Sequence, residues 1–176
     1  MKYLIVNADD FGLSQGINKG IIEAHQNGVV TSTSLMVDEV AANEAAALNS
    51  YKDLSVGLHF VALDVEPTSQ QDEFDRQLTK FQDIIGHRPD HIDTHKITPN
   101  KDANIQQVIK VYADKHHTPV RSFGEAKYIR SYFGLKSGGV GSLMPERVSL
   151  NGLRHALGEA GEGYNELIYV SCGLFG

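Results

Sequence analysis

The stretch Ile5-Val6-Asn7-Ala8-Asp9-Asp10-Phe11-Gly12 decides the fold, because an apolar run ends here in two adjacent carboxylates and a glycine. The residues before it, 1–6, have the continuous apolar character of a strand buried on both faces of a parallel sheet. Ligands of parallel α/β sheets bind at the carboxyl ends of the strands. Neighbouring strand residues point to opposite faces, so Asp9 and Asp10 can serve one site only if the chain turns, and Gly12 permits a turn. Taken alone, the stretch could equally be an acidic turn that caps the next helix.

The composition is that of an ordinary single-domain protein. The 176 residues contain no linker or charge block, so we expect one domain over residues 1–176. A net charge of −6 and the lack of a basic stripe argue against a nucleic-acid partner. The sequence shows no signal-peptide pattern and no run of about 18 apolar residues, so we expect no membrane partner and a cytoplasmic location. The single cysteine, Cys172, excludes an internal disulfide and a cysteine-only metal cluster.

Strand-like and helix-like segments alternate along the rest of the chain. Further strands are predicted at residues 29–37, 54–60, 91–94, 119–122 and 166–172. Helices are predicted from an N-cap at Ser14 to a stop at Asn27-Gly28, and at residues 40–48, 73–85, 103–116 and 145–160. The glycine-rich run at 134–141 lacks the spacing of a phosphate-binding loop and is predicted to be a flexible loop. The alternation indicates a parallel sheet, and local pattern does not choose between a doubly wound layer and a barrel.

Side chains of the kind that bind metals follow three of these strands. Asp9 and Asp10 come after the first, His59 ends the third, and His95 lies just past the fourth. If the strands are parallel neighbours, one carboxylate and two imidazoles converge on one rim of the sheet. Such a set leaves coordination positions open for water and substrate, which is typical of catalytic metal sites. The second carboxylate could then take the proton of the attacking water. Each histidine alone could be an ordinary polar residue, but their joint occurrence with the aspartates favours a metal site.

Two other residues near these strand ends have candidate roles. The alternation of a strand puts His91, Asp93 and His95 on one face, so Asp93 could orient an imidazole of the site. Arg121, at the end of the expected strand 119–122, could bind a substrate oxygen or form a surface ion pair.

Four motifs in this order resemble the YdjC family of carbohydrate (chitooligosaccharide) deacetylases. They are Asn-Ala-Asp-Asp-Phe-Gly at 7–12, Gly-Val-Val-Thr-Ser-Thr-Ser at 28–34, Gly-Leu-His-Phe at 57–60 and His-Ile-Asp-Thr-His at 91–95. The resemblance covers roughly residues 1–125. It implies an α/β fold, an incomplete or distorted (β/α) barrel similar to that of polysaccharide deacetylases.

The resemblance also implies an activity and the residues that perform it. The family hydrolyses the N-acetyl group of sugars such as chitooligosaccharides, so the resemblance implies a small carbohydrate as the substrate. Homodimers are common in the family, so a homodimer is also expected. A divalent metal, commonly assigned as magnesium, is implied at the positions of Asp10, His59 and His95, with Asp9 as the general base. The donor set by itself suits zinc or another transition metal better, because magnesium prefers more oxygen ligands.

The chain departs from the family pattern in its second half. His95 is followed by Lys96-Ile97-Thr98 rather than by further histidines, and no histidine follows Glu166-Leu167, where the family carries a plausible general acid. The chain also ends at Gly176, short of the usual family length, so we expect a shortened C-terminus. Two alternatives therefore stay open: a metallohydrolase acting on another bond, such as a phosphoester, and a catalytically impaired relative that binds metal or sugar.

Overall fold

A single parallel sheet organises the protein. The computed structural model describes residues 3–62, 67–95, 102–121, 123, 127–129, 150–159 and 167–173. The strands are β1 (Tyr3–Phe11), β2 (Ser32–Leu35), β3 (Ser55–Phe60), β4 (Ile92–Thr94), β5 (Lys127–Ile129) and β6 (Leu167–Gly173). They form a 6-stranded sheet in the order β4-β3-β2-β1-β6-β5, and every neighbouring pair is parallel.

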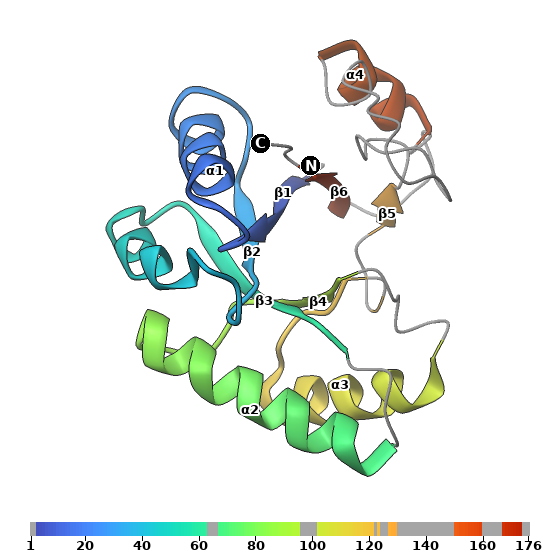
Figure 1. The fold of residues 1–176 in the computed structure, drawn as a ribbon. Coiled ribbons are helices and arrows are strands. Elements are labelled where there is room, and N and C mark those ends of the chain that lie inside the picture. The colour runs from blue at the N-terminus through green and yellow to red at the C-terminus, as the bar shows by residue number, and fades with distance from the viewer. Residues whose placement is uncertain are drawn as a thin grey trace.

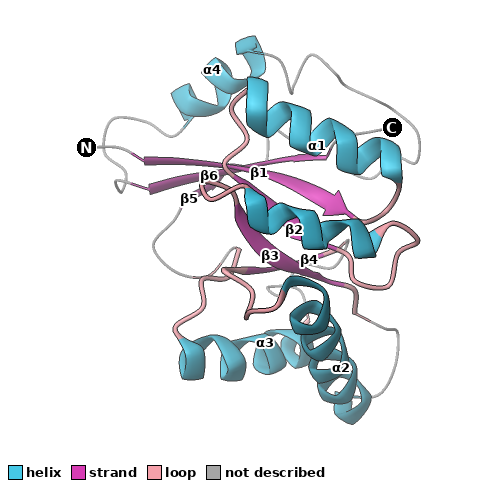
Figure 2. Cartoon of the chain, turned by 90° about the vertical axis from the view of Figure 1, so that its left-hand side faces the viewer, coloured by secondary structure: helices cyan, strands magenta, loops and turns pink. Residues whose placement is uncertain are grey.

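Helices cover the outer side of this sheet. They are α1 (Gln15–Asn27), the 3-10 helix η1 (Ala42–Ser50), α2 (Pro67–Ile85), α3 (Ala103–His116) and α4 (Leu150–Glu159). In Figure 1 the strands follow an arc, with α1, η1, α2 and α3 on its convex side. Figure 2 shows the sheet from a second direction, with α1 lying along it and α2 and α3 beyond β3 and β4. The fold is thus an α/β half-barrel, which confirms the prediction of an incomplete (β/α) barrel and rules out the doubly wound layer.

The two faces of the sheet differ in chemistry. The outer face carries apolar side chains such as Ala8, Leu58, Phe60 and Ile92, all 0% exposed, which join one core cluster with residues of α1, α2 and α3. Along β1 to β4, the inner face is polar although it is also buried. Its buried members are Asn7, Asp9, Ser32, Ser34, His59, His91 and Asp93. Buried polar groups need hydrogen-bond partners, so the inner face must form a connected network.

Several predicted elements agree closely with the structure. Ser14 caps α1 by accepting a hydrogen bond from the backbone N–H of Ile17, and α3 spans the predicted residues 103–116 behind the cap of Asp102. The helix expected at 73–85 begins earlier, at Pro67, whose fixed φ suits the first helical position. Among the described helices, none is long and apolar enough to cross a membrane.

One predicted helix is of the 3-10 type, and one predicted strand is wrong. The alanine-rich segment is a 3-10 helix rather than an α-helix. At its end the side chains of Asn49 and Ser50 donate hydrogen bonds to the carbonyls three residues back, which competes with α-helical bonding.

The strand expected at 119–122 is reduced to isolated bridges of Val120 with Ile92 and Phe123, because the chain turns back on itself after Arg121. The fifth strand lies at Lys127–Ile129 instead. The glycine-rich run at 134–141 lies outside the described residues.

Candidate active site

A bulge at the end of β1 directs two consecutive carboxylates to one site. The register between β1 and β2 shifts between Ala8 and Phe11, and Asp10 adopts a left-handed backbone with φ of 69°. This conformation is uncommon outside glycine, although aspartate tolerates it better than most residues. In a regular strand Asp10 would point to the outer face. The turn predicted for this stretch therefore exists, and it involves Asp10 itself as well as Gly12, whose φ is 99°.

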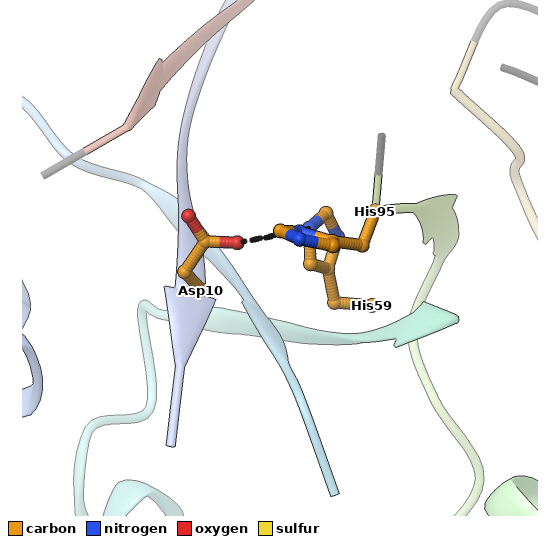
Figure 3. A group of neighbouring side chains, drawn as sticks. All are labelled: Asp10, His59 and His95. Carbon is orange, nitrogen blue, oxygen red and sulfur yellow. Dashed lines mark hydrogen bonds and ion pairs between the residues drawn. The ribbon is translucent and has the colours of Figure 1, made fainter. Parts of the chain in front are cut away.

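Asp10, His59 and His95 meet at the carboxyl ends of β1, β3 and β4 (Figure 3). The Oδ1 atom of Asp10 lies 3.1 Å from Nε2 of His59 and 3.2 Å from Nδ1 of His95. The two imidazole nitrogens are 3.3 Å apart. The structure thus brings together the three residues that the sequence nominated as metal ligands.

The spacing of these atoms fits a metal ion. Nitrogen and oxygen ligands lie about 2.0–2.2 Å from zinc and similar ions, which puts neighbouring ligands about 3.0–3.5 Å apart. The observed separations of 3.1–3.3 Å fall within that range. One carboxylate and two imidazoles could therefore hold a divalent cation and leave coordination positions for water and substrate. Their role as ligands remains a prediction, and two imidazoles suit a transition metal better than magnesium, which prefers more oxygen ligands.

His59 is oriented by a carboxylate behind it. Its Nδ1 atom donates a hydrogen bond to Oδ1 of Asp93, and this leaves Nε2 facing Asp10 and His95. Burial lowers the pKa of His59, but the charge of Asp93 and the hydrogen bond with Asp10 outweigh burial and raise it to about 10. Burial alone would raise the pKa of Asp10, but its hydrogen bonds to His59 and His95 hold that pKa below its usual value. The site therefore attracts positive charge, whether a proton or a metal cation.

Arg121 lies between the two other carboxylates of the inner face. Its Nη1 atom donates to Oδ2 of Asp9 at 2.9 Å, and its Nη2 atom forms close ion pairs with Asp9 and with Asp93. The Arg121 side chain is 10% exposed, so neither a surface ion pair nor a free substrate-binding group describes it. Burial would raise the pKa of Asp93, but the charges of Arg121 and His59 keep it below its usual range. The two-pronged contact fixes the orientation of the Asp9 carboxylate.

Polar side chains that sequence reasoning missed complete this network. The amide of Asn7 donates to Oδ1 of Asp9 at 2.7 Å and to Oγ of Ser34 at 3.2 Å, and Ser32 donates to the Asn7 oxygen at 2.6 Å. A signal for them was present in the sequence. Asn7 with Asp9, and Ser32 with Ser34, repeat with the period of two that marks one face of a strand.

His91 shares the inner face, as the strand alternation predicts, but it is not among the converging ligands. Its ring lies over Gly57 of β3, where a Cβ atom would come within 2.3 Å of the His91 Nε2 atom. Burial lowers the pKa of His91, which favours the neutral ring. His91 is thus part of the wall of the half-barrel rather than of the metal site.

Comparisons with known proteins identify a family and relatives that the chain is similar to. The model of the YdjC-like protein family matches residues 3–72. The chitooligosaccharide deacetylase of Serratia marcescens is 35% identical over 150 aligned residues, covering 68% of this chain and 59% of that protein. The carbohydrate deacetylase of Geobacillus stearothermophilus is 36% identical over 153 residues, covering 72% and 62%. The chitooligosaccharide deacetylase of Klebsiella pneumoniae (strain 342) is 43% identical over 123 residues, covering 53% and 49%.

Solved structures support the fold alone, because their sequences are distant. A protein of Enterococcus faecalis V583 named after cellobiose-phosphate cleavage superposes with a TM-score of 0.79 at 22% identity, covering 98% of this chain and 80% of that one. A mutant of a CE4-family pseudoenzyme with restored activity gives a TM-score of 0.60 at 11% identity, covering 98% and 57%. The chain spans about half to three fifths of the length of the curated relatives. The resemblance to the YdjC-like family is confirmed.

Proposed function

We propose that this YdjC-like protein is a metal-dependent hydrolase that removes N-acetyl groups from amino sugars or chitooligosaccharides. The observation that carries the proposal is the convergence of Asp10, His59 and His95 on one rim, next to a second carboxylate, Asp9, that Arg121 and Asn7 hold in place. The names of the curated relatives support the reaction and a small carbohydrate as the substrate.

The roles of the ligand residues follow from their contacts. A divalent ion held by Asp10, His59 and His95 would polarise the amide carbonyl and lower the pKa of a water molecule. Asp93 accepts a hydrogen bond from the Nδ1–H of His59, which keeps the proton on Nδ1 and presents the lone pair of Nε2 to the ligand position.

Asp9 is the proposed general base. Its carboxylate takes a proton from the attacking water while the water oxygen bonds to the acetyl carbon. When the C–N bond breaks, the same proton can pass from Asp9 to the leaving amine, so acetate and a free amino sugar result. Arg121 and Asn7 keep the carboxylate in one orientation through both proton transfers.

Replacement of the base separates binding from chemistry. Asp9→Asn should retain metal and lose acetate release from N-acetylglucosamine oligomers by about 100-fold or more, because general-base catalysis contributes that much. Metal content and acetate would be measured on the same preparations. Equal acetate release by wild type and Asp9→Asn would remove Asp9 from the reaction.

The same assay distinguishes the alternative activities. Turnover of aryl phosphates without acetate release would indicate a phosphoester hydrolase. Sugar binding without acetate release, across several divalent metals, would indicate a catalytically impaired relative.

A further inference from the structure

Asn18, a residue of α1, joins the two loops that follow β1 and β2. Its side-chain oxygen accepts a hydrogen bond from the backbone N–H of Gly12 at 2.6 Å. Its amide nitrogen donates to the carbonyl of Ala41 at 3.1 Å and to Oε2 of Glu44 at 2.8 Å. Asn18 is 1% exposed. Because the side-chain oxygen accepts a hydrogen bond and the side-chain nitrogen donates two, this buried amide restrains the positions of the groups that it contacts.

The loop that Asn18 holds contains the strained ligand residue. Asp10 and Gly12 both have positive φ, and a left-handed backbone at Asp10 persists only when its surroundings enforce it. Backbone bonds from Met36 N–H to the Phe11 carbonyl, 2.8 Å, and from Ala41 N–H to the Gly12 carbonyl, 2.9 Å, also fasten this segment to the loop after β2. Asn18 contacts both sides of that junction, at Gly12 and at Ala41.

The packing around Gly12 leaves the loop little freedom. A Cβ atom at Gly12 would lie 2.8 Å from the Met36 carbonyl oxygen and 3.2 Å from the Cα atom of Ala42. The Gly12 N–H points into this crowded interior, where the Asn18 oxygen is its partner. Without that acceptor, the N–H would have to turn toward water to regain a hydrogen bond, which requires the backbone between Asp10 and Gly12 to move.

We propose that Asn18 is a positioning residue for the metal site: by holding Gly12 against Ala41 it keeps Asp10 in the left-handed conformation that places its carboxylate beside His59 and His95. The inference rests on the proposed metal site, and Asn18 itself does not contact the ligand position. A relaxed, extended Asp10 would point away from the two histidines. Removal of the Asn18 side chain should therefore weaken metal binding, although Asn18 does not contact the ligand position.

The test is the binding of Co²⁺ alone to metal-free protein, followed by chelator competition and by the visible absorption spectrum of the bound ion. Asn18→Ala should bind Co²⁺ at least about tenfold more weakly than wild type, as is usual for residues that support metal ligands, with an altered spectrum. Asn18→Asp in a Glu44→Gln background keeps an acceptor for the Gly12 N–H without placing two carboxylates against each other, and the Ala41 N–H still bonds the Gly12 carbonyl. Its affinity should stay within about threefold of wild type, less than the loss usual for such residues.

A matched control separates positioning from general stability. Asn49 also donates a hydrogen bond from its side-chain amide to a backbone carbonyl of another element, that of Ile85 at 2.8 Å. Asn49 lies near the end of η1, whereas Glu44 lies near its start. Asn49→Ala should lower the melting temperature and leave the Co²⁺ affinity and spectrum unchanged.

Each outcome decides the proposal. Wild-type affinity in folded Asn18→Ala would overturn it, as would an equal loss in Asn49→Ala. If Asn18→Ala does not fold, Asn18→Asp in the Glu44→Gln background decides: an affinity loss of about tenfold or more, the loss typical of a broken ligand support, would overturn the proposal. Co²⁺ binding by wild type without acetate release would refute the hydrolase and leave the role of Asn18 standing, whereas no Co²⁺ binding by wild type would refute both.

Discussion

Asp93 contacts both the proposed metal ligand His59 and Arg121, the residue that holds the proposed base. One of its oxygens accepts from His59 and the other pairs with Arg121, which also holds Asp9. The side chain of Asp93 is 0% exposed, and the charge of Arg121 together with the hydrogen bond from His59 compensates the cost of burying its carboxylate. The ligand His59 and the proposed base Asp9 are thus positioned through a shared carboxylate.

Asp93→Asn should weaken metal binding by about 10- to 100-fold, because the neutral amide no longer orients and polarises His59. It should also destabilise the fold by about 3–5 kcal/mol, since Arg121 loses one of its buried charge partners. Chelator competition and urea unfolding measure the two effects. Asp90→Asn is the control, because Asp90 accepts from the backbone N–H of Val56 at the opposite end of the same strand pair. Unchanged metal affinity in Asp93→Asn would contradict this role.

Gly57 makes room for the ring of His91. Gly57→Ala should destabilise the protein by about 1–3 kcal/mol through overpacking, and the penalty should shrink in a His91→Ala background. Gly20→Ala, in α1, is the control, because a Cβ atom there meets nothing within 4 Å and alanine favours the helix by up to about 1 kcal/mol. Unfolding free energies from urea titration give the comparison. A Gly57→Ala variant as stable as wild type would show that the ring of His91 moves aside freely.

At the level of elements, a charged cluster ties the loop after β2 to α2. Asp38 receives hydrogen bonds from Arg76 and from Lys80, the latter at 2.9 Å. The pKa of Asp38 is lowered from 3.8 to about 2, mainly by the hydrogen bond from Arg76. Partial burial opposes this shift, and the hydrogen bond from Lys80 adds to it. A lowered pKa means that the ionised group stabilises the fold above about pH 4 and that this contribution is lost as the pH falls through about 2.

Arg76→Ala should therefore move the titration midpoint of Asp38 upward, toward 3.8, as observed by carboxyl NMR. The accompanying loss of stability at neutral pH should stay below about 1 kcal/mol, because the Arg76 and Asp38 side chains are 48% and 39% exposed and solvent screens the pair. Lys110→Ala, which removes the exposed Lys110–Asp114 pair of α3, is the control and should leave Asp38 unchanged. An unshifted midpoint in Arg76→Ala would contradict the assignment.

Elements with strong local signals could be predicted from the sequence, and those set by distant contacts could not. The cap at Ser14 and the helix at 103–116 depend on the local sequence, and both appear as predicted. The segment after α3 pairs with Ile92 and then turns back, which depends on a strand far away in sequence. Strand alternation likewise located Asp93, but the ion pair of Arg121 with Asp9 joins residues 112 positions apart and has no local signature.

At the scale of the whole molecule, the half-barrel separates two kinds of interior. Apolar side chains fill the space between the sheet and the outer helices, and polar side chains line the inner face. The carboxyl ends of β1, β3 and β4 come together on the inner rim because these strands are parallel and lie within one sheet. The alternation of strands and helices predicted the parallel sheet, whereas its curvature arises from packing that the local pattern does not encode.

Some expectations for the whole protein remain predictions. They are a single domain over residues 1–176, a cytoplasmic location, a homodimer and the identity of the metal. The chain matches about half to three fifths of the length of its curated relatives, so activity on a carbohydrate has to be measured on this chain.

If Asp10, His59 and His95 form one metal site, the metal-free protein should bind a divalent metal at equilibrium through these three residues. Titration with Zn²⁺ or Co²⁺, monitored by calorimetry and checked by elemental analysis, should show one ion per wild-type chain. The same titration should show no specific ion in the folded His59→Ala/His95→Ala double variant. Retention of the ion by that variant, with wild-type stoichiometry and affinity, would contradict the site.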